Sequence, residues 1–375
     1  MSLRTAEALA ATSNVYTWEP PDRVIAARYG VAEDQILRFD LNTSPGAPAF
    51  LPEALPGPYD PALNEYPDST YAELAEAAAA YVDASPEEIL VGCGADEVLD
   101  IIAKAFLAPG DVSVVPIPTY SMYGVLTTQR GARLATLPRL GAAAGFALDL
   151  PAMRAALPDA AVVWLCAPNN PTGAPEAAAD IEALLQAGAA LEAGGPIFVV
   201  DEAYIEFHPG SLAPLREHFP ALVVVRTVSK AFALPGLRVG YAVATRSTIE
   251  RMERFRPPGS VSTVSATIAA SALRRSGVAS ANAEAIGAER DWLAGRLAAL
   301  GIESYPSVTN FLLCPIGTQD EAEAATEHLL RGGIVPRTFG PANPLRGHLR
   351  FTVRDRRQNE RFLDVLEAWV DGRPA

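Results

Sequence analysis

Lysine is rare in this chain, and its rarity directs attention to one loop. The sequence has only two lysines, Lys104 and Lys230, against 28 arginines. A coding bias toward arginine accounts for the imbalance, but arginine cannot replace a lysine that must form an imine with a carbonyl group. Lys104 lies in an amphipathic helical pattern, which indicates a surface position. Lys230 ends the segment TVSK (227–230) after an apolar run, so we predict that Lys230 is the chemically active lysine.

A second candidate is the carboxylate that ends another apolar run. Asp201 directly follows the segment IFVV (197–200), which predicts a central strand. A buried carboxylate requires a cationic or hydrogen-bonding partner. A pyridinium nitrogen is such a partner, and Tyr204 is close enough in sequence to reach the same ring. Ligands of open α/β sheets bind beyond the carboxyl ends of the strands, where both residues are expected to lie.

Two segments have the composition of a phosphate site. The segment GCGADE (92–97) follows a predicted strand and opens a helix, whose first N–H groups can hold a phosphate. It is not a dinucleotide fingerprint, because Glu97 stands where the third glycine belongs, and taken alone the segment is more often an ordinary strand–helix turn. Arg238, eight residues beyond the lysine, is a natural phosphate partner, and Thr227 and Ser229 add hydroxyl groups.

Two further segments could contact a flat ring. The segment PTY (118–120) ends in Tyr120, which can stack on a heterocycle. The segment NNPTG (169–173) places Asn170 at a strand end, where its amide can donate to a phenolate oxygen. Each segment alone is more often a packing aromatic or a proline–glycine turn.

The spacing of apolar runs predicts the elements that must position these residues. We expect a helix at 70–82, then strands at 89–91, 112–117, 161–166, 197–200, 222–228 and 239–244, several of them separated by helices at 95–107, 120–129 and 175–187. This α/β alternation indicates a mostly parallel sheet covered by helices on both faces. We therefore predict a large domain over residues 46–260.

The pattern changes near residue 260. A long helical region to Leu300 precedes an apolar run at 311–314, a helix at 320–331, short strands near 334–339 and 348–353, and a helix at 356–370. We predict a smaller α+β domain over residues 261–375. The irregular, proline-rich residues 1–45 are expected to pack against it.

Composition excludes several classes of partner. The net charge of −14 argues against nucleic acid, and no apolar run has the length of a membrane helix. The N-terminus lacks the pattern of a signal peptide. Three widely spaced cysteines indicate reduced thiols in a cytoplasmic protein, and four histidines without ligand spacing predict no metal site.

Taken in order, these segments resemble a known family. The succession GCGADE, PTY, NNPTG, DEAY, TVSKAFALPGLRVG is similar to that of fold-type I pyridoxal-5′-phosphate (PLP) enzymes, in the aminotransferase class I/II superfamily. The likeness spans roughly residues 14–370 and is nearest to the histidinol-phosphate aminotransferases. It implies a seven-stranded, mostly parallel sheet in a large domain, a smaller α+β domain, and amino-group exchange with a 2-oxo acid such as 2-oxoglutarate.

The resemblance also implies a role for individual residues. Lys230 would form the Schiff base with PLP and move protons, Asp201 would pair with the pyridine nitrogen, and Asn170 and Tyr204 would bind the phenolic oxygen. Tyr120 would stack on the ring. Residues implied to hold the cofactor phosphate are Ala95, Asp96, Thr227, Ser229 and Arg238. Those implied to meet the substrate are Arg350, Arg337 and Asn42, and Tyr66 would reach the partner's cofactor in a homodimer with shared active sites.

The departures from the family pattern lie on the substrate side. Glu65 precedes the Tyr-Pro pair where the family often has arginine, the segment NTSP (42–45) differs from the usual Asn-Glu-Asn-Pro, and Pro336 precedes Arg337. The amino donor therefore stays open. A threonine-phosphate decarboxylase, an aromatic amino-acid aminotransferase and a PLP-binding regulator without catalysis remain alternatives, although the chain offers no room for a DNA-binding module.

Overall fold

A seven-stranded sheet forms the centre of the larger lobe. The computed structural model describes residues 19–46, 65–192 and 194–372. The strand order is β2-β8-β7-β6-β5-β3-β4, and β8 alone runs antiparallel to its neighbours. The strands are β2 (Ile89–Gly92), β3 (Val112–Ile117), β4 (Arg133–Pro138), β5 (Ala160–Cys166), β6 (Ile197–Asp201), β7 (Leu222–Thr227) and β8 (Gly240–Val243). This arrangement confirms the predicted mostly parallel sheet.

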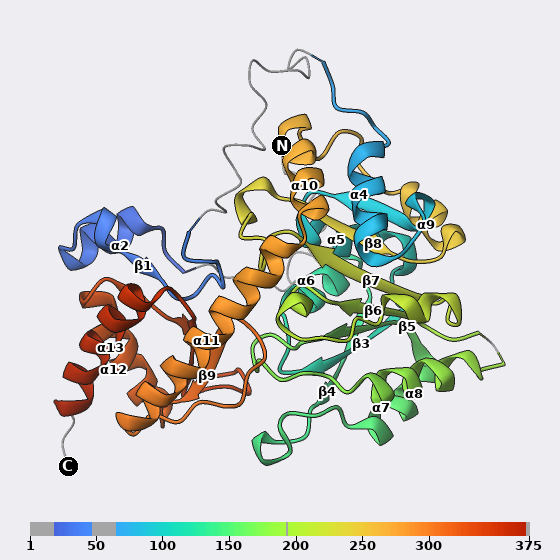
Figure 1. Ribbon diagram of the computed structural model, residues 1–375. Helices are drawn as coiled ribbons and strands as arrows, with labels where there is room; N and C mark the ends of the chain where they lie inside the picture. Colours follow the sequence, from blue (N-terminus) through green and yellow to red (C-terminus); the bar gives the residue numbers. More distant parts are fainter. Residues whose placement is uncertain (1–18, 47–64, 193, 373–375) are drawn as a thin grey trace, which may run out of the picture.

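Helices cover both faces of this sheet (Figure 1). One apolar core lies under α4 (Ala72–Val82), α7 (Leu150–Ala156), α8 (Ala178–Ala189) and α10 (Thr263–Arg274). The other lies under α5 (Gly94–Phe106), α6 (Met122–Gln129) and α9 (Arg246–Glu253). In β7, Val224 belongs to the first core, whereas Val223 and Val225 belong to the second. Burial on both faces explains why the inner strands are continuous apolar runs.

A smaller lobe is built from the C-terminal part of the chain and an N-terminal segment. Its antiparallel sheet has the order β11-β12-β9, formed by β11 (Arg337–Thr338), β12 (His348–Thr352) and β9 (Phe311–Pro315). The helices α12 (Gln319–Arg331) and α13 (Arg356–Asp371) pack on it. Strand β1 (Leu37–Arg38) pairs in parallel with β10 (Ile334–Val335), and α2 (Asp22–Tyr29) precedes it.

One long helix joins the two lobes. Helix α11 (Gly277–Ala299) contributes Ala279 to the core of the large lobe, and Ile286 and Leu293 to the core of the small lobe. Figure 1 shows it crossing between them. Helix α10, beyond the boundary predicted at residue 260, packs in the core of the sheet-containing lobe. The division into domains at that residue stays a prediction, and residues 1–18 of the predicted N-terminal segment lie outside the described residues.

Several elements differ from the sequence prediction. Strand β4 was not predicted because it is the edge strand, with the exposed side chains of Arg133 and Thr136 and a terminal Pro138 in place of an apolar run. Helix α2 lies in a segment that we predicted to be irregular; only Ile25 is buried there, so its apolar pattern is weak. The long helical region that follows residue 260 is interrupted at Arg275 and Ser276, between α10 and α11.

Candidate functional site

The predicted site residues of the larger lobe gather at the carboxyl edge of its sheet. Lys230 lies just beyond β7, and its Nζ lies 5.6 Å from the centre of the Tyr204 ring. The same amine lies 3.5 Å from the main-chain oxygen of Asn42. Burial and the nearby Arg350 guanidinium lower the pKa of Lys230 to about 8. Lys104, in contrast, forms an ion pair of 2.6 Å with Asp100 on the surface of α5.

Asp201 ends β6 and is almost fully buried. Its carboxylate accepts hydrogen bonds from the Tyr123 hydroxyl (2.8 Å) and from the main-chain N–H of Ala203 (3.0 Å). Burial raises the pKa of Asp201 to about 6, while these two donors act in the opposite direction. A carboxylate in this position can bind a cationic ring nitrogen strongly, because little water competes for it.

A corner suited to a phosphate lies at the N-terminus of α5. Gly94 opens this helix at φ +78°, and a side chain there would collide with the Arg238 guanidinium. Gly240, which pairs with Thr227 across β7 and β8, lies so close to the main-chain nitrogen of Ala95 that a Cβ could not fit. The corner therefore joins an arginine to the unpaired N–H groups of a first helical turn.

The remaining side chains predicted for this corner contact one another. The hydroxyl groups of Thr227 and Ser229 lie 2.8 Å apart. Arg238 is half-exposed and lies 3.3 Å from the Asp96 carboxylate, which also accepts a hydrogen bond of 2.9 Å from the Tyr120 hydroxyl. Tyr120 thereby links the corner to the wall of the neighbouring cavity.

A third group of residues connects the two lobes beside the lysine. The buried Asn42 donates a hydrogen bond of 3.0 Å to the Tyr204 hydroxyl. Arg350, on β12, donates through Nη1 to the Asn170 side-chain oxygen at 2.6 Å and through Nη2 to the main-chain oxygen of Asp40. The residues predicted to meet the substrate thus contact residues predicted to meet the cofactor.

A cavity of about 620 Å³ opens at this junction. It is lined by Tyr120 and Asn170 from the large lobe and by Arg337 and Arg350 from the small lobe. The two arginines are direct neighbours across β11 and β12. Two guanidinium groups on one wall suit a substrate that carries negative charge.

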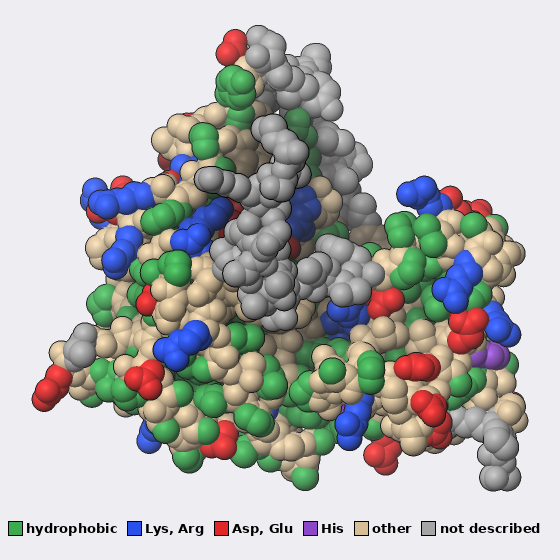
Figure 2. Space-filling model, turned by 180° about the vertical axis from the view of Figure 1, so that it is seen from behind, with side chains coloured by type: hydrophobic (Ala, Val, Ile, Leu, Met, Phe, Trp, Pro, Cys, Tyr) green, Lys and Arg blue, Asp and Glu red, His purple; other side chains and the backbone are tan. Residues whose placement is uncertain are grey.

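Tyr66 lies apart from this cluster. Its side chain is 97% exposed, so it does not pack on its own subunit. The structure contains one chain and leaves its predicted role at a dimer interface untested. On the face shown in Figure 2, acidic and basic side chains are interspersed over the visible surface.

The described residues contain neither a candidate metal-binding group nor a helix that could span a membrane. Within residues 19–46, 65–192 and 194–372, no group of histidine, cysteine and acidic side chains could hold a metal ion. In the same residues, no helix combines the length and apolarity needed to cross a bilayer. The three cysteines, Cys93, Cys166 and Cys314, are free thiols.

The sequence analysis missed Tyr123, which contacts the site directly. Its buried hydroxyl holds the Asp201 carboxylate, and its ring stacks on Trp164 at a centroid distance of 5.5 Å. A signal was available, because Tyr120 and Tyr123 are three residues apart just past a strand end and face the same edge. It also missed Glu19, which lines the cavity.

Comparison with known proteins agrees with this geometry. Residues 58–366 match the family described as aminotransferase class I and II. A histidinol-phosphate aminotransferase of Roseiflexus castenholzii is 36% identical over 94% of both chains, and one of Thermoanaerobacter pseudethanolicus is 36% identical over 81% of this chain and 84% of its own. The solved histidinol-phosphate aminotransferase of Sinorhizobium meliloti, in complex with PLP, has a TM-score of 0.87 and 25% identity, covering 99% of this chain and 98% of its own.

The seven-stranded sheet, with its lysine, buried carboxylate and phosphate corner at one edge, defines a PLP enzyme of fold-type I. The chain belongs to the class I and II aminotransferases. The threonine-O-3-phosphate decarboxylase of Porphyromonas gingivalis shares the fold, with a TM-score of 0.75 at 23% identity over 90% of this chain and all of its own.

Proposed function

We propose that this aminotransferase moves the amino group of histidinol phosphate to 2-oxoglutarate. One observation carries the choice of donor: Arg337 and Arg350 lie side by side on the wall of the cavity that Tyr120 and Asn170 also line. Relatives with 35–36% identity over most of the chain are named histidinol-phosphate aminotransferases, which supports the same substrate here. Histidinol phosphate carries a phosphate and no carboxylate, whereas glutamate carries two carboxylates, so one anion-binding cavity must accept both.

Pyridoxal 5′-phosphate, when bound, supplies an aldehyde that takes up the amino group and a ring that withdraws electrons from the substrate α-carbon. Lys230 is proposed to bind that aldehyde and, once released, to take the proton from the α-carbon with its Nζ amine. Because burial lowers the pKa of this amine, more of it is neutral near neutral pH than for an exposed lysine, and only the neutral amine can accept a proton.

The buried carboxylate and the phosphate corner are proposed to hold the cofactor. Asp201 would keep the ring nitrogen protonated, which requires the carboxylate to be charged, and Tyr123 supports that charge through its hydrogen bond. The N–H groups of Ala95 and Asp96 and the side chains of Thr227, Ser229 and Arg238 would bind the phosphate. Tyr120 would stack on the ring, and Asn170 and Tyr204 would donate to its phenolic oxygen.

On the substrate side, Arg350 is proposed to bind the glutamate α-carboxylate. Its guanidinium is buried and held by Asn170 and by the main chain of Asp40, so its direction is fixed before substrate arrives. Arg337 would bind the phosphate of the donor or the distal carboxylate of glutamate. Asn42 would orient Tyr204 and, through its main-chain oxygen, the Lys230 amine.

We also propose that the enzyme is a cytoplasmic homodimer. A tyrosine that is 97% exposed next to a proline supports a role for Tyr66 in the active site of the partner. Three free thiols, two of them buried, agree with a reducing compartment.

A panel of amino donors with 2-oxoglutarate tests the reaction. We expect histidinol phosphate to have the highest kcat/KM, with glutamate as the product. Higher kcat/KM for phenylalanine or tyrosine would identify an aromatic aminotransferase. Release of carbon dioxide from threonine phosphate without any 2-oxo acid would identify a decarboxylase, and either result would refute the proposal.

A further inference from the structure

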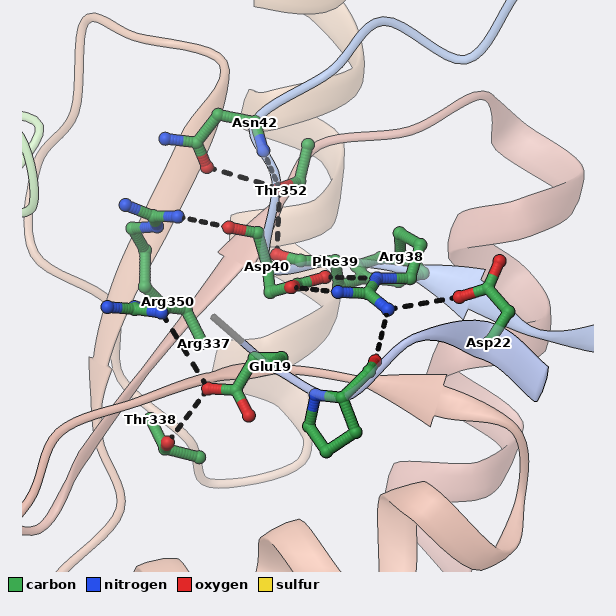
Figure 3. A network of polar contacts seen from close by, with 11 residues as sticks. Glu19, Asp22, Arg38, Phe39, Asp40, Asn42, Arg337, Thr338, Arg350 and Thr352 are labelled. Atoms are coloured by element: carbon green, nitrogen blue, oxygen red, sulfur yellow. Dashed lines mark hydrogen bonds and ion pairs between the residues drawn. The ribbon is translucent and has the colours of Figure 1, made fainter. Parts of the chain in front are cut away.

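Glu19 stands in the wall of the substrate cavity beside Arg337. Its Oε1 lies 3.9 Å from Nη1 of Arg337 and accepts a hydrogen bond of 3.0 Å from the Thr338 hydroxyl (Figure 3). Both contacts use the same oxygen. Among the residues that the structure describes, no hydrogen-bond donor reaches Oε2, which therefore keeps its capacity to accept. A carboxylate bound through one oxygen at a cavity wall can receive a donor group from a ligand.

The segment that carries Glu19 is held firmly in place. Arg38 donates to the main-chain oxygen of Pro20 at 2.8 Å and to the Asp22 carboxylate at 3.0 Å. The same guanidinium binds both oxygens of Asp40, at 2.8 and 2.6 Å. The main-chain oxygen of Asp40 accepts a hydrogen bond from Arg350. Arg38 therefore fixes the position of the Glu19 segment relative to Arg350 (Figure 3).

The contact between Glu19 and Arg337 is a weak ion pair. The atoms are too far apart for a hydrogen bond, and the side chains are 19% and 22% exposed. Pairs of this kind contribute little to stability. The arrangement instead places a negative and a positive group next to each other in the cavity wall.

We propose that Glu19 is a specificity residue that accepts a hydrogen bond from an N–H group in the side chain of the amino donor, while Arg337 binds the donor's anion. The inference rests on the proposed function and narrows its substrate class to donors that carry both groups, such as an imidazole with a phosphate. A distal carboxylate alone meets Arg337 but is repelled by Glu19. The carboxylate therefore favours one class of ligand and disfavours the other.

The variant Glu19→Gln tests this assignment, because it removes the charge and keeps the shape. In ping-pong kinetics the KM of each substrate is obtained separately. We expect the KM for histidinol phosphate to rise about tenfold, the order of a lost charge-assisted hydrogen bond. The KM for 2-oxoglutarate should fall by about two- to fivefold, because the variant removes a partly exposed negative charge that repels the distal carboxylate of this substrate.

Two small probes test the same residue whatever the donor proves to be. Titration of the holoenzyme with inorganic phosphate and with imidazole gives dissociation constants without turnover. In Glu19→Gln, phosphate should bind more tightly and imidazole more weakly. The control is Glu33→Gln, which removes the same charge from an exposed position on the same segment and should leave all four constants unchanged within about twofold.

Opposite shifts for the N–H ligand and the anion support the proposal. Shifts of both dissociation constants in the same direction would indicate a structural role for Glu19. An unchanged dissociation constant for imidazole would show that Glu19 does not bind the N–H ligand. Both results overturn the proposal. If the wild type does not accept histidinol phosphate, the proposed function fails, but the phosphate and imidazole titrations still decide the role of Glu19.

Discussion

Replacing Tyr123 by phenylalanine should make the stability of the apoprotein more dependent on pH. The Tyr123 hydroxyl donates to the Asp201 carboxylate at 2.8 Å, and both groups are buried. Phenylalanine keeps the ring that stacks on Trp164 and removes only the hydroxyl. The carboxylate then retains the hydrogen bond from Ala203 alone. The lost Tyr123 hydroxyl stabilised the charged carboxylate of Asp201 more than the neutral carboxyl group, so the variant disfavours ionisation of Asp201.

The magnitude follows from the pKa of Asp201. Burial raises this pKa from 3.8 to about 6. Ionisation of Asp201 therefore destabilises the folded apoprotein by about 3 kcal/mol above pH 6 and by nothing below about pH 4. A lost hydrogen bond to a charged group costs about 1.5–3 kcal/mol, which raises the pKa by a further ~1–2 pH units. The extra loss of stability in Tyr123→Phe is then close to zero at pH 5 and about 1–2 kcal/mol at pH 8.

Urea unfolding of the apoprotein at pH 5 and pH 8 measures this difference. The control is Tyr120→Phe, whose hydroxyl donates at 2.9 Å to the half-exposed Asp96 carboxylate, so its loss should change stability little at either pH. An equal loss of stability at both pH values in Tyr123→Phe would refute the reasoning. It would show that the hydroxyl does not support the charge of Asp201.

Three further outcomes are expected. Lys230→Ala should abolish transamination and the visible absorbance that borohydride bleaches in the wild type; labelling of Lys104 by borohydride would refute the assignment. Arg337→Ala should raise the KM for histidinol phosphate by about ten- to a hundredfold and the KM for an unphosphorylated aromatic donor much less, and equal effects would remove Arg337 from phosphate binding. Mixing Tyr66→Phe with Lys230→Ala chains should restore activity above that of either variant, because one hybrid site keeps both residues. Absence of rescue, or a monomeric enzyme, would contradict the shared site.

The sheet and its cofactor edge could be predicted because both rest on local signals. Strands buried on both faces must be apolar throughout, and in an α/β fold the residues after them must share one edge. Asp201 and Lys230 each follow such a run, and the structure brings both to that edge. The family assignment from the ordered segments is confirmed by the match over residues 58–366.

The missed features depend on contacts between distant segments. Glu19 reaches the cavity because β1 pairs with β10, nearly 300 residues later, and neither two-residue strand has a recognisable pattern. Tyr123 is buried by its partners Asp201 and Trp164, which lie far away in sequence. The specific roles predicted for the site residues stay predictions until ligands are bound.

The junction between the lobes divides the enzyme into two separately variable parts. Lys230, Asp201 and the α5 corner belong to the sheet, whereas Arg337, Arg350 and the segment with Glu19 belong to the small lobe. Substitutions that alter substrate choice can therefore accumulate in the small lobe while the cofactor chemistry stays intact. Asn42 and Arg350 cross this division: Asn42 is anchored to Thr352 of the small lobe and hydrogen-bonded to Tyr204 of the large lobe, and Arg350 of the small lobe donates to Asn170 of the large lobe. Evolution or engineering of new substrates is most constrained at these two residues.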